Sequence, residues 1–306
     1  MTPLDRLKKD LEKINKIIRI EKLLTQNWHT KIIQKYYQKM DFLYRYFHSK
    51  EGAMHFPLYL PNGEKHHAEA LTEQANYIIR EAKKKNATKV IELGCGMGYN
   101  VRYIAENLPT TQSYGLDLSK SHLVFAEKKS HHLKNTHWIE GNLENPNLKD
   151  FDILFAVESF CYTQNLEFTL QNWYNSTKKG GKAIIFDVFL PPTYHDSNES
   201  FKIATQITAV GFAVKNWWEI ENVQKTAEKV GWKINQITDI SKSIQPNLQR
   251  FGRDTSKLLD YHLVTKFCYQ IGVFPSVWLK HCITGILAAH TIGSEAQGYY
   301  QIELEK

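Results

Sequence analysis

The sequence predicts an α/β fold: a doubly wound, mostly parallel sheet of seven strands covered by helices on both faces. Two observations support this prediction. Short apolar segments alternate along the chain with segments in which apolar residues recur every three or four positions, the pattern of strand and helix in turn. The apolar segments are continuous rather than interrupted by polar residues, which is typical of parallel strands buried on both faces.

Residues 1–67 lie outside this alternation, and we expect them to form an N-terminal helical and aromatic arm. Apolar residues spaced by three and four predict an amphipathic helix that packs on the body of the protein or on a partner subunit. These residues are Leu4, Leu7, Leu11, Ile14 and Ile18. The stretch from residue 28 to residue 59 is rich in tryptophan, tyrosine and phenylalanine.

The core of the predicted fold begins at residue 68, and a helix over 68–85 leads into the first strand. Strands are expected near 89–93, 113–118, 136–141, 151–158 and 182–189, with helices between them near 99–108, 120–129 and 166–177. Gly180-Gly181 is expected to end the last of these helices and to begin the fifth strand, because glycine commonly closes a helix.

The pattern changes after Pro191-Pro192. A helix is expected over 219–230, ended by Gly231, and the sixth strand over 232–240, which closes the core at residue 240. Residues 241–297 are expected to form a mostly helical cap insert. Residues 298–306 alternate polar and apolar side chains and are expected to return to the core as its terminal strand.

The most informative stretch joins the first strand to the following helix. Glu92 precedes three glycines, Gly94, Gly96 and Gly98, at alternate positions. Such a turn either simply joins strand to helix or lets backbone N–H groups approach a ligand, since no Cβ is in the way. The second strand ends in Asp117, about 20 residues on, where a doubly wound fold places a carboxylate for a ribose diol.

The spacing of the turn separates the candidate ligands. A dinucleotide fingerprint reads G-x-G-x-x-G, and the anion of Glu92 would repel a pyrophosphate. No Gly-Lys-Ser/Thr follows the glycines, which excludes a phosphate loop. An NAD(P)-binding oxidoreductase would share the fold and is the main alternative, but its glycine spacing and a Tyr-x-x-x-Lys pair are missing.

The run from Glu92 to Gly98 resembles the first motif of the class I S-adenosylmethionine-dependent methyltransferases, which have a Rossmann-like fold. The resemblance implies S-adenosyl-L-methionine as cofactor, with Asp117 on the ribose hydroxyls and Asn142 on the adenine. The implied cofactor-binding residues are Glu92, Gly94, Cys95, Gly96, Gly98, Asp117, Leu118, Asn142, Leu143, Val157 and Glu158. A protein that kept this core and lost catalysis is the second alternative.

A second resemblance lies in the arm. Tyr36-Tyr37, Asp41-Phe42, Tyr44-Arg45-Tyr46 and Met54-His55-Phe56 are similar to the stretch before the core in sterol C-methyltransferases and related enzymes, although Gln38 replaces the usual acid. It implies that Tyr36, Tyr37 and His55 lie at the methionine end of the cofactor. The acceptor would then be a small apolar or amphipathic molecule: a sterol, an isoprenoid, a lipid or a secondary metabolite.

The fourth strand ends in Glu158, at the carboxyl edge where open α/β sheets bind ligands. Glu158 is either a general base or orienting acceptor, or a carboxylate that caps the next helix. With Tyr162 and His55 it completes the candidate catalytic residues. No Asn/Asp-Pro-Pro-Tyr/Phe follows, which disfavours methylation of amide or nucleobase nitrogen, and no aspartate set indicates a metal.

The net charge of +7 is spread over many lysines and is compatible with acidic ligands or an anionic membrane surface. No nucleic-acid partner is expected. The four cysteines form no C-x-x-C pair and no signal peptide is present, which predicts reduced thiols in the cytoplasm. No apolar run reaches the ~18 residues of a membrane span. Besides a small-molecule acceptor, a peripheral membrane contact and a homodimer remain open.

Overall fold

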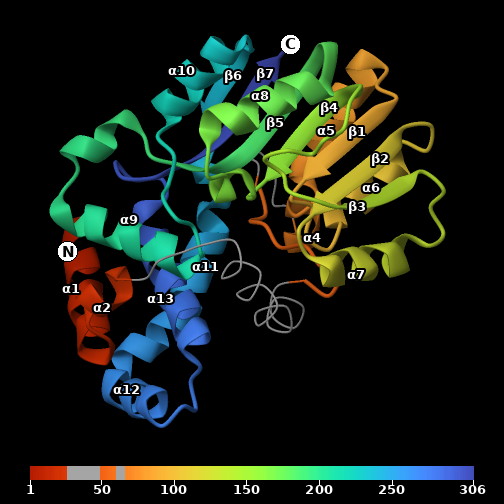
Figure 1. The fold of residues 1–306 in the computed structure, drawn as a ribbon. Helices are drawn as coiled ribbons and strands as arrows, with labels where there is room; N and C mark the ends of the chain where they lie inside the picture. The colour runs from red at the N-terminus through yellow and green to blue at the C-terminus, as the bar shows by residue number, and fades with distance from the viewer. Residues whose placement is uncertain (26–48, 60–65) are drawn as a thin grey trace. The chain divides into compact units, whose positions relative to one another are not determined.

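The computed structural model describes residues 1–25, 49–59 and 66–306. The chain divides into two compact units, and the described residues of each are treated separately. Unit 1 comprises Met1–Asp41, Val188–Ile220 and Ile244–Tyr299, whereas unit 2 comprises Phe42–Asp187, Glu221–Ser243 and Tyr300–Lys306. Figure 1 shows that the sheet and the helices that cover it make up unit 2, and that unit 1 is helical.

Unit 2 is built on a seven-stranded sheet, which confirms the predicted fold class. The strands are β1 (Lys89–Leu93), β2 (Gln112–Asp117), β3 (Thr136–Glu140), β4 (Phe151–Val157), β5 (Thr177–Phe189), β6 (Lys233–Asp239) and β7 (Gly298–Glu305). Their order is β3-β2-β1-β4-β5-β7-β6. The pairs β1–β2, β1–β4, β2–β3 and β4–β5 are parallel, and β6–β7 is antiparallel.

The strand order reverses direction between β1 and β4. The chain runs outward from β1 through β2 to β3 and then returns to the other side of β1 with β4. In open α/β sheets this switch point is where the loops after two neighbouring strands part and leave room for a ligand. The topology therefore places the candidate site at the carboxyl ends of β1 and β4.

Helices cover the sheet of unit 2. They are α4 (His67–Ala70), α5 (Glu73–Lys85), α6 (Tyr99–Asn107), α7 (Lys120–Ser130), α8 (Leu166–Ser176) and α10 (Ile220–Val230), with a short 3₁₀ turn η2 (Phe160–Tyr162) after β4. Trp173 of α8 is fully buried, and its ring lies 5.3 Å from that of Phe160, edge to face. The continuous apolar run of β4 is likewise buried, as expected for a central parallel strand.

The helix predicted over 68–85 is divided into α4 and α5. At the division, the carbonyl of Ala70 accepts a hydrogen bond from Leu58 N (2.9 Å), and the carbonyl of Leu71 accepts one from His55 Nε2 (3.0 Å). Two carbonyls in the middle of the predicted helix are thus bonded to the segment 49–59 instead of only to the next helical turn. The break is set by tertiary contacts, which local periodicity does not report.

The expectation that Gly180-Gly181 ends a helix and begins the fifth strand was wrong. Helix α8 ends at Ser176, and β5 begins at Thr177 and runs through both glycines. Gly180 N donates to the carbonyl of Lys306 (2.7 Å), and Lys306 N donates to the carbonyl of Gly181 (3.0 Å). Pairing with the last residue of the chain therefore extends the strand backward.

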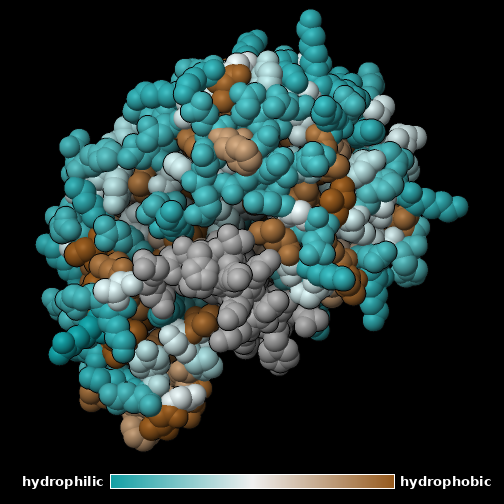
Figure 2. Space-filling view, in the orientation of Figure 1, coloured by the Kyte–Doolittle hydropathy of each residue, from teal (hydrophilic) through white to brown (hydrophobic). Residues whose placement is uncertain are grey.

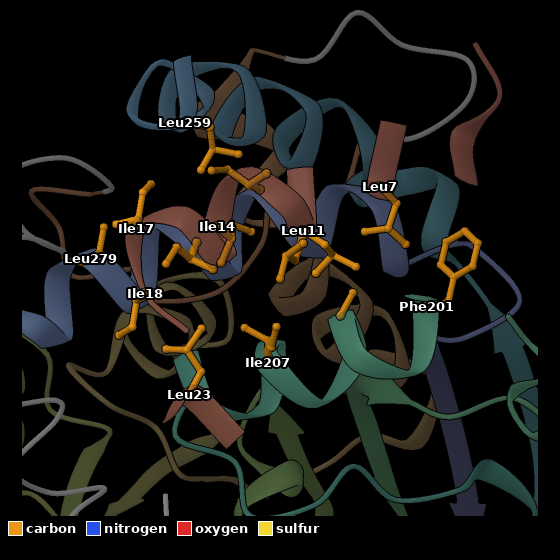
Figure 3. Packing of buried hydrophobic residues seen from close by; sticks show 14 of the residues in the cluster. Leu7, Leu11, Ile14, Ile17, Ile18, Leu23, Phe201, Ile207, Leu259 and Leu279 are labelled. Atoms are coloured by element: carbon orange, nitrogen blue, oxygen red, sulfur yellow. The ribbon is translucent and has the colours of Figure 1, made fainter. Parts of the chain in front are cut away.

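Unit 1 consists of helices around an apolar cluster. The helices are α1 (Pro3–Ile17), α2 (Ile20–Leu24), α9 (Glu199–Gly211), α11 (Ser241–Asp260), α12 (His262–Gln270) and α13 (Ser276–Thr291), with a 3₁₀ turn η3 (Pro192–Asp196). Helix α1 confirms the predicted amphipathic helix and packs within the chain: Leu7, Leu11 and Ile14 are buried against residues of α9 and α13 (Figure 3). Helix α9 was not predicted from the sequence.

In the part of the chain that the structure describes, no helix is both long enough and apolar enough to span a bilayer.

Candidate active site

The glycine turn between β1 and α6 is fixed to the neighbouring strand β2. The backbone N–H groups of Gly94 and Cys95 both donate to the carbonyl of Leu116, at 2.8 and 3.0 Å. The φ angles of Gly94, Gly96 and Gly98 are +81°, +52° and +73°. All three lie in the left-handed region, which glycine adopts without steric cost.

Two of the three glycines are required by packing inside the protein. A Cβ at Gly94 would lie 2.4 Å from the Cβ of Ser159, and a Cβ at Gly98 would lie 2.3 Å from the ring of Trp138. Both distances are far below van der Waals contact. Gly94 and Gly98 therefore let the turn approach the loop after β4 and the strand β3.

Gly96 differs from its two neighbours. The nearest atom to a Cβ placed there is the sulfur of Met54, at 3.3 Å, at the end of a flexible side chain. Gly96 N donates to Asp117 Oδ2 at 2.8 Å. Gly96 is thus the position in the turn where the backbone has room for a ligand beside a carboxylate.

Asp117 ends β2 at the predicted place, next to the glycine turn. Its second oxygen, Oδ1, accepts a hydrogen bond from Ser119 N (2.8 Å), the residue that caps α7. The ring of His122, which is buried, lies with Nδ1 3.6 Å from the same oxygen. The sequence analysis missed His122, because a single histidine one turn into a helix gives no signal of its own.

Glu92 is the most unusual group in the site. It is 2% exposed, and its Oε1 accepts a hydrogen bond from Asn100 Nδ2 at 2.8 Å. Burial, together with the charge of Asp117, raises the pKa of Glu92 to about 8, although hydrogen bonds from Asn100 and from the backbone of Val101 oppose this change. A carboxyl group with so high a pKa lies in an environment that does not compensate its negative charge.

Two buried oxygens of this hydrogen-bonded pair have no donor among the described residues. Among the described residues, neither Glu92 Oε2 nor Asn100 Oδ1 has a hydrogen-bond partner, and Asn100 is 3% exposed. Buried acceptors without partners are rare in proteins and cost free energy. A ligand ammonium carries a positive charge and several N–H donors, so it would satisfy both oxygens. The cofactor expected from the sequence carries such an ammonium, and these residues fit it.

The residues expected near the adenine lie at the same edge of the sheet. Asn142 is exposed, and its Oδ1 accepts a hydrogen bond from Glu144 N (3.0 Å) in its own turn. Leu143 is buried, and its carbonyl accepts a bond from the indole of Trp173 (2.8 Å). Leu118, half-buried, follows Asp117 directly. Their contact with an adenine stays a prediction.

Glu158 has an unusual backbone. Its φ is +52°, which is uncommon for a residue with a side chain. Its N–H donates to the carbonyl of Phe186 (2.8 Å), which ties the end of β4 to β5. Its Oε1 accepts a hydrogen bond from Phe56 N at 2.7 Å. Val157 before it is buried.

The segment 49–59 connects the glycine turn with Glu158. Met54 lies beside Gly96. Phe56, two residues after Met54, donates its N–H to Glu158. The carbonyl of Phe56 accepts a hydrogen bond from Gln74 Nε2 (2.7 Å), which fixes the segment on α5. Two groups of predicted site residues, distant in the sequence, are thereby brought to one edge.

The remaining candidates are placed as follows. His55 is 5% exposed, and because a carbonyl can only accept, its Nε2 carries a proton that it donates to Leu71. Tyr162 lies half-buried in η2. Tyr36 and Tyr37 lie outside the described residues. None of these observations assigns a catalytic role.

A buried carboxylate supports the loop after β4. Asp187 Oδ2 accepts a hydrogen bond from Cys161 N at 2.9 Å, and Asp187 is 1% exposed. Burial, followed by the charges of Asp187 and Glu158, raises the pKa of the Cys161 thiol well above its usual value. Burial likewise raises the pKa of Cys95. Both are therefore neutral thiols and not nucleophiles.

No group of three or more histidine, cysteine, aspartate or glutamate side chains suited to a metal ion occurs among the residues that the structure describes.

Residues 91–183, from β1 into β5, match the protein-family profile described as "Methyltransferase domain". The chain is 26% identical over 132 residues to the malonyl-[acyl-carrier protein] O-methyltransferase of Halalkalibacterium halodurans, which covers 42% of this chain and 48% of that protein. It is 22% identical over 223 residues to a sterol 24-C-methyltransferase of Neurospora crassa, which covers 70% of this chain and 57% of that protein. The chain thus spans about half the length of the curated relatives that it matches.

Among solved structures, the cyclopropane synthase of Mycobacterium tuberculosis has a TM-score of 0.72 and 13% sequence identity, over 91% of this chain and 98% of that one. This likeness shows the fold. Together, the seven-stranded sheet and the sequence matches show that the chain has the fold of the class I methyltransferases and that its residues 91–183 resemble a methyltransferase domain.

Proposed function

We propose that the protein transfers the methyl group of S-adenosylmethionine to a small apolar or amphipathic acceptor. The observation that carries the proposal is a pair of buried acceptors, Glu92 Oε2 and Asn100 Oδ1, that have no donor among the described residues. They flank a glycine turn in which Gly96 has room for a ligand. This arrangement suits an amino-acid ammonium, which would hold Glu92 in its charged form. It disfavours the pyrophosphate of NAD(P), because the pyrophosphate brings no donor to these oxygens and would be repelled by a charged Glu92.

We propose that each part of the site holds one part of the cofactor. Glu92 and Asn100 bind the ammonium, and Asp117 accepts hydrogen bonds from the ribose hydroxyls. Leu118, Asn142 and Leu143 border the adenine at the neighbouring strand ends. The sulfonium of the bound cofactor supplies an already activated methyl group, so the protein contributes mainly orientation and exclusion of water.

Glu158 is the proposed acceptor of a proton. Its left-handed backbone and the hydrogen bond from Phe56 fix the carboxylate at the carboxyl edge of β4. If the acceptor atom loses a proton when it is methylated, this carboxylate receives it, a role worth about 10²–10⁴ in rate. If no proton is lost, the same carboxylate orients the acceptor or stabilises a positive charge on it. Tyr162 and His55 are proposed to border the acceptor.

The proposed acceptor class rests on the relatives and on the aromatic arm. The Neurospora crassa relative is named for a sterol, and the tuberculosis structure is a cyclopropane synthase. We propose a sterol, isoprenoid, lipid or similar metabolite as the acceptor, and a membrane surface as a second partner.

Two measurements on the full chain test the proposal. S-adenosylhomocysteine at 100-fold over its dissociation constant should stabilise the protein by about 2.7 kcal/mol in thermal unfolding, and NAD should not. Labelled S-adenosylmethionine should then transfer its methyl group to a member of a panel of sterols, isoprenoid diphosphates and fatty acids.

The outcomes separate the alternatives. Stabilisation by NAD and not by S-adenosylhomocysteine would show a dinucleotide-binding protein. Stabilisation by S-adenosylhomocysteine without transfer to any acceptor, including water-soluble amines and phenols, would favour a binding protein that has lost catalysis.

A further inference from the structure

Helix α12 and the turn that follows it expose a cluster of large apolar side chains. Six residues within thirteen consecutive positions have exposed fractions of 57% or more: Tyr261, Leu263, Val264, Phe267, Ile271 and Val273, here called the α12 patch. Elsewhere in the described residues, the large apolar side chains that are exposed are Met1, Val124 and Phe168, each alone. Figure 2 shows brown surface at the end of unit 1 that Figure 1 labels α12.

The patch is one face of a helix whose other face is packed. Leu263, Phe267 and Ile271 are four residues apart, so they form a stripe along α12. On the opposite face Thr265 is buried, and its hydroxyl donates to the carbonyl of Leu258 at 2.8 Å. The stripe therefore points away from the core of unit 1. A contiguous apolar surface of this kind usually marks a binding surface.

The charges around the patch are mostly positive. Between Tyr261 and Val273 the single charged residue is Lys266, which is exposed. The acid that directly precedes the patch, Asp260, forms an ion pair with Lys13 Nζ at 2.8 Å. Lys257 lies one turn before Asp260 and is exposed. Since the nearest acid is paired with Lys13, and Lys257 and Lys266 have no acid between them other than Asp260, the border of the patch carries a net positive charge.

We propose that the α12 patch docks unit 1 on the surface of a bilayer that contains anionic lipids. A helix with an apolar stripe and lysine at its border lies in the interfacial plane, with the apolar side chains among the acyl chains and the lysines at the headgroups. A second copy of the chain would bring two cationic borders together, whereas anionic headgroups complement them. The proposal deepens the membrane contact of the proposed function by naming its surface, and it concerns unit 1 alone. It does not depend on cofactor binding or methyl transfer.

Co-sedimentation of the full chain with vesicles tests the proposal. The protein should bind vesicles of phosphatidylcholine mixed with phosphatidylglycerol, and more weakly as salt is raised. The triple variant Leu263→Gln, Phe267→Gln, Ile271→Gln should lower the partition coefficient by about tenfold or more. Lys266→Glu should weaken binding to the mixed vesicles and leave binding to pure phosphatidylcholine unchanged.

A matched control separates the patch from exposed apolar side chains in general. Val124→Gln with Phe168→Gln removes two exposed apolar groups of unit 2 and should leave vesicle binding unchanged. All the substituted side chains are exposed, so the variants should keep the wild-type melting temperature. That temperature, and its rise with S-adenosylhomocysteine, reports on the proposed function independently of vesicle binding.

The docking proposal is overturned if the wild type binds neither kind of vesicle, or if the triple variant binds as well as the wild type. It is also overturned if sedimentation velocity finds a wild-type dimer that the triple variant cannot form, together with no vesicle binding. The patch would then be a contact between two copies of the chain.

Discussion

Two of the buried carboxylate sites in unit 2 differ in how completely the protein satisfies them. At one site, nearer the amino ends of the strands, Lys182 Nζ bonds to Glu81 Oε2 at 2.7 Å and to Glu303 Oε1 at 2.6 Å. Tyr77 donates its hydroxyl to Glu303 Oε2 at 2.8 Å. All three charged residues are less than 9% exposed. At the other site, Glu92 has one bonded oxygen and one without a partner among the described residues.

The pKa values follow this difference. Although burial alone would raise it, hydrogen bonds from Lys182 and Lys84 lower the pKa of Glu81. At Glu92, hydrogen bonds offset the effect of burial only in part, and the pKa rises to about 8. A buried charge that the fold compensates contributes to structure. A buried carboxyl group that lacks hydrogen-bond donors, next to a glycine turn at a topological switch point, indicates the place of a ligand.

The largest expected effect breaks the compensated site. Lys182→Met removes the cation between Glu81 and Glu303 and leaves two buried carboxylates close together. We expect the free energy of unfolding, measured in urea, to fall by about 3–5 kcal/mol. A loss below about 1 kcal/mol would show that the site is solvated in solution and that the comparison is wrong.

The next effect separates ligand binding from stability. Glu92→Gln keeps an acceptor for Asn100 and cannot ionise in the unfolded chain, so the ligand-free variant should be at least as stable as the wild type at neutral pH. The affinity for S-adenosylhomocysteine, measured by calorimetry, should fall by about 1.5–3 kcal/mol, the value of a hydrogen bond to a charged group. Equal affinity in wild type and variant would remove Glu92 from the cofactor site.

The pH dependence sharpens the comparison. In the unfolded chain Glu92 loses its proton near its ordinary pKa of 4.5, whereas in the folded chain it keeps it to about 8. Between these values the folded state binds the extra proton, so this group makes stability fall as pH rises, by up to about 1.4 kcal/mol per pH unit. Thermal unfolding of the ligand-free protein from pH 5 to pH 8 checks this, and Glu92→Gln should remove that part of the slope.

The smallest effect is the control for Lys182. Lys229 forms an ion pair with Glu167 at 2.7 Å, but both side chains are more than half exposed. Lys229→Ala should change the free energy of unfolding by less than about 1 kcal/mol, because water screens exposed pairs. A loss as large as that of Lys182→Met would mean that burial does not distinguish the two sites.

Much of this architecture could be predicted from the sequence, because the parallel strands are continuous apolar runs and the glycine turn has a distinctive spacing. The predicted strands coincide with β1 to β4 to within a residue at each end. Helix α9 was missed because its residues are buried on several sides, so it shows no clear amphipathic period. The start of β5 was wrong because pairing with Lys306 sets it.

In the candidate site, the sequence predicted the residues that belong to a sequence motif. It did not predict those that reach the site only through tertiary contacts. Glu92 and Asp117 were found from their distance to the glycines. Asn100 and Ser159 were not, because they reach the turn from a helix and from the loop after β4. The different roles of Gly94 and Gly96 could not be predicted from the sequence either. Only the folded chain shows that a Cβ would clash with Ser159 at Gly94 and not at Gly96.

The central claim is that the oxygen of Glu92 without a donor among the described residues binds the ammonium of the cofactor. The most direct test is calorimetric titration of wild type and Glu92→Gln with S-adenosylhomocysteine and with its deaminated analogue, which lacks only the amino group. The account predicts that the variant loses about 1.5–3 kcal/mol of affinity for S-adenosylhomocysteine and none for the analogue. An equal loss for both ligands, or no loss for either, would contradict it.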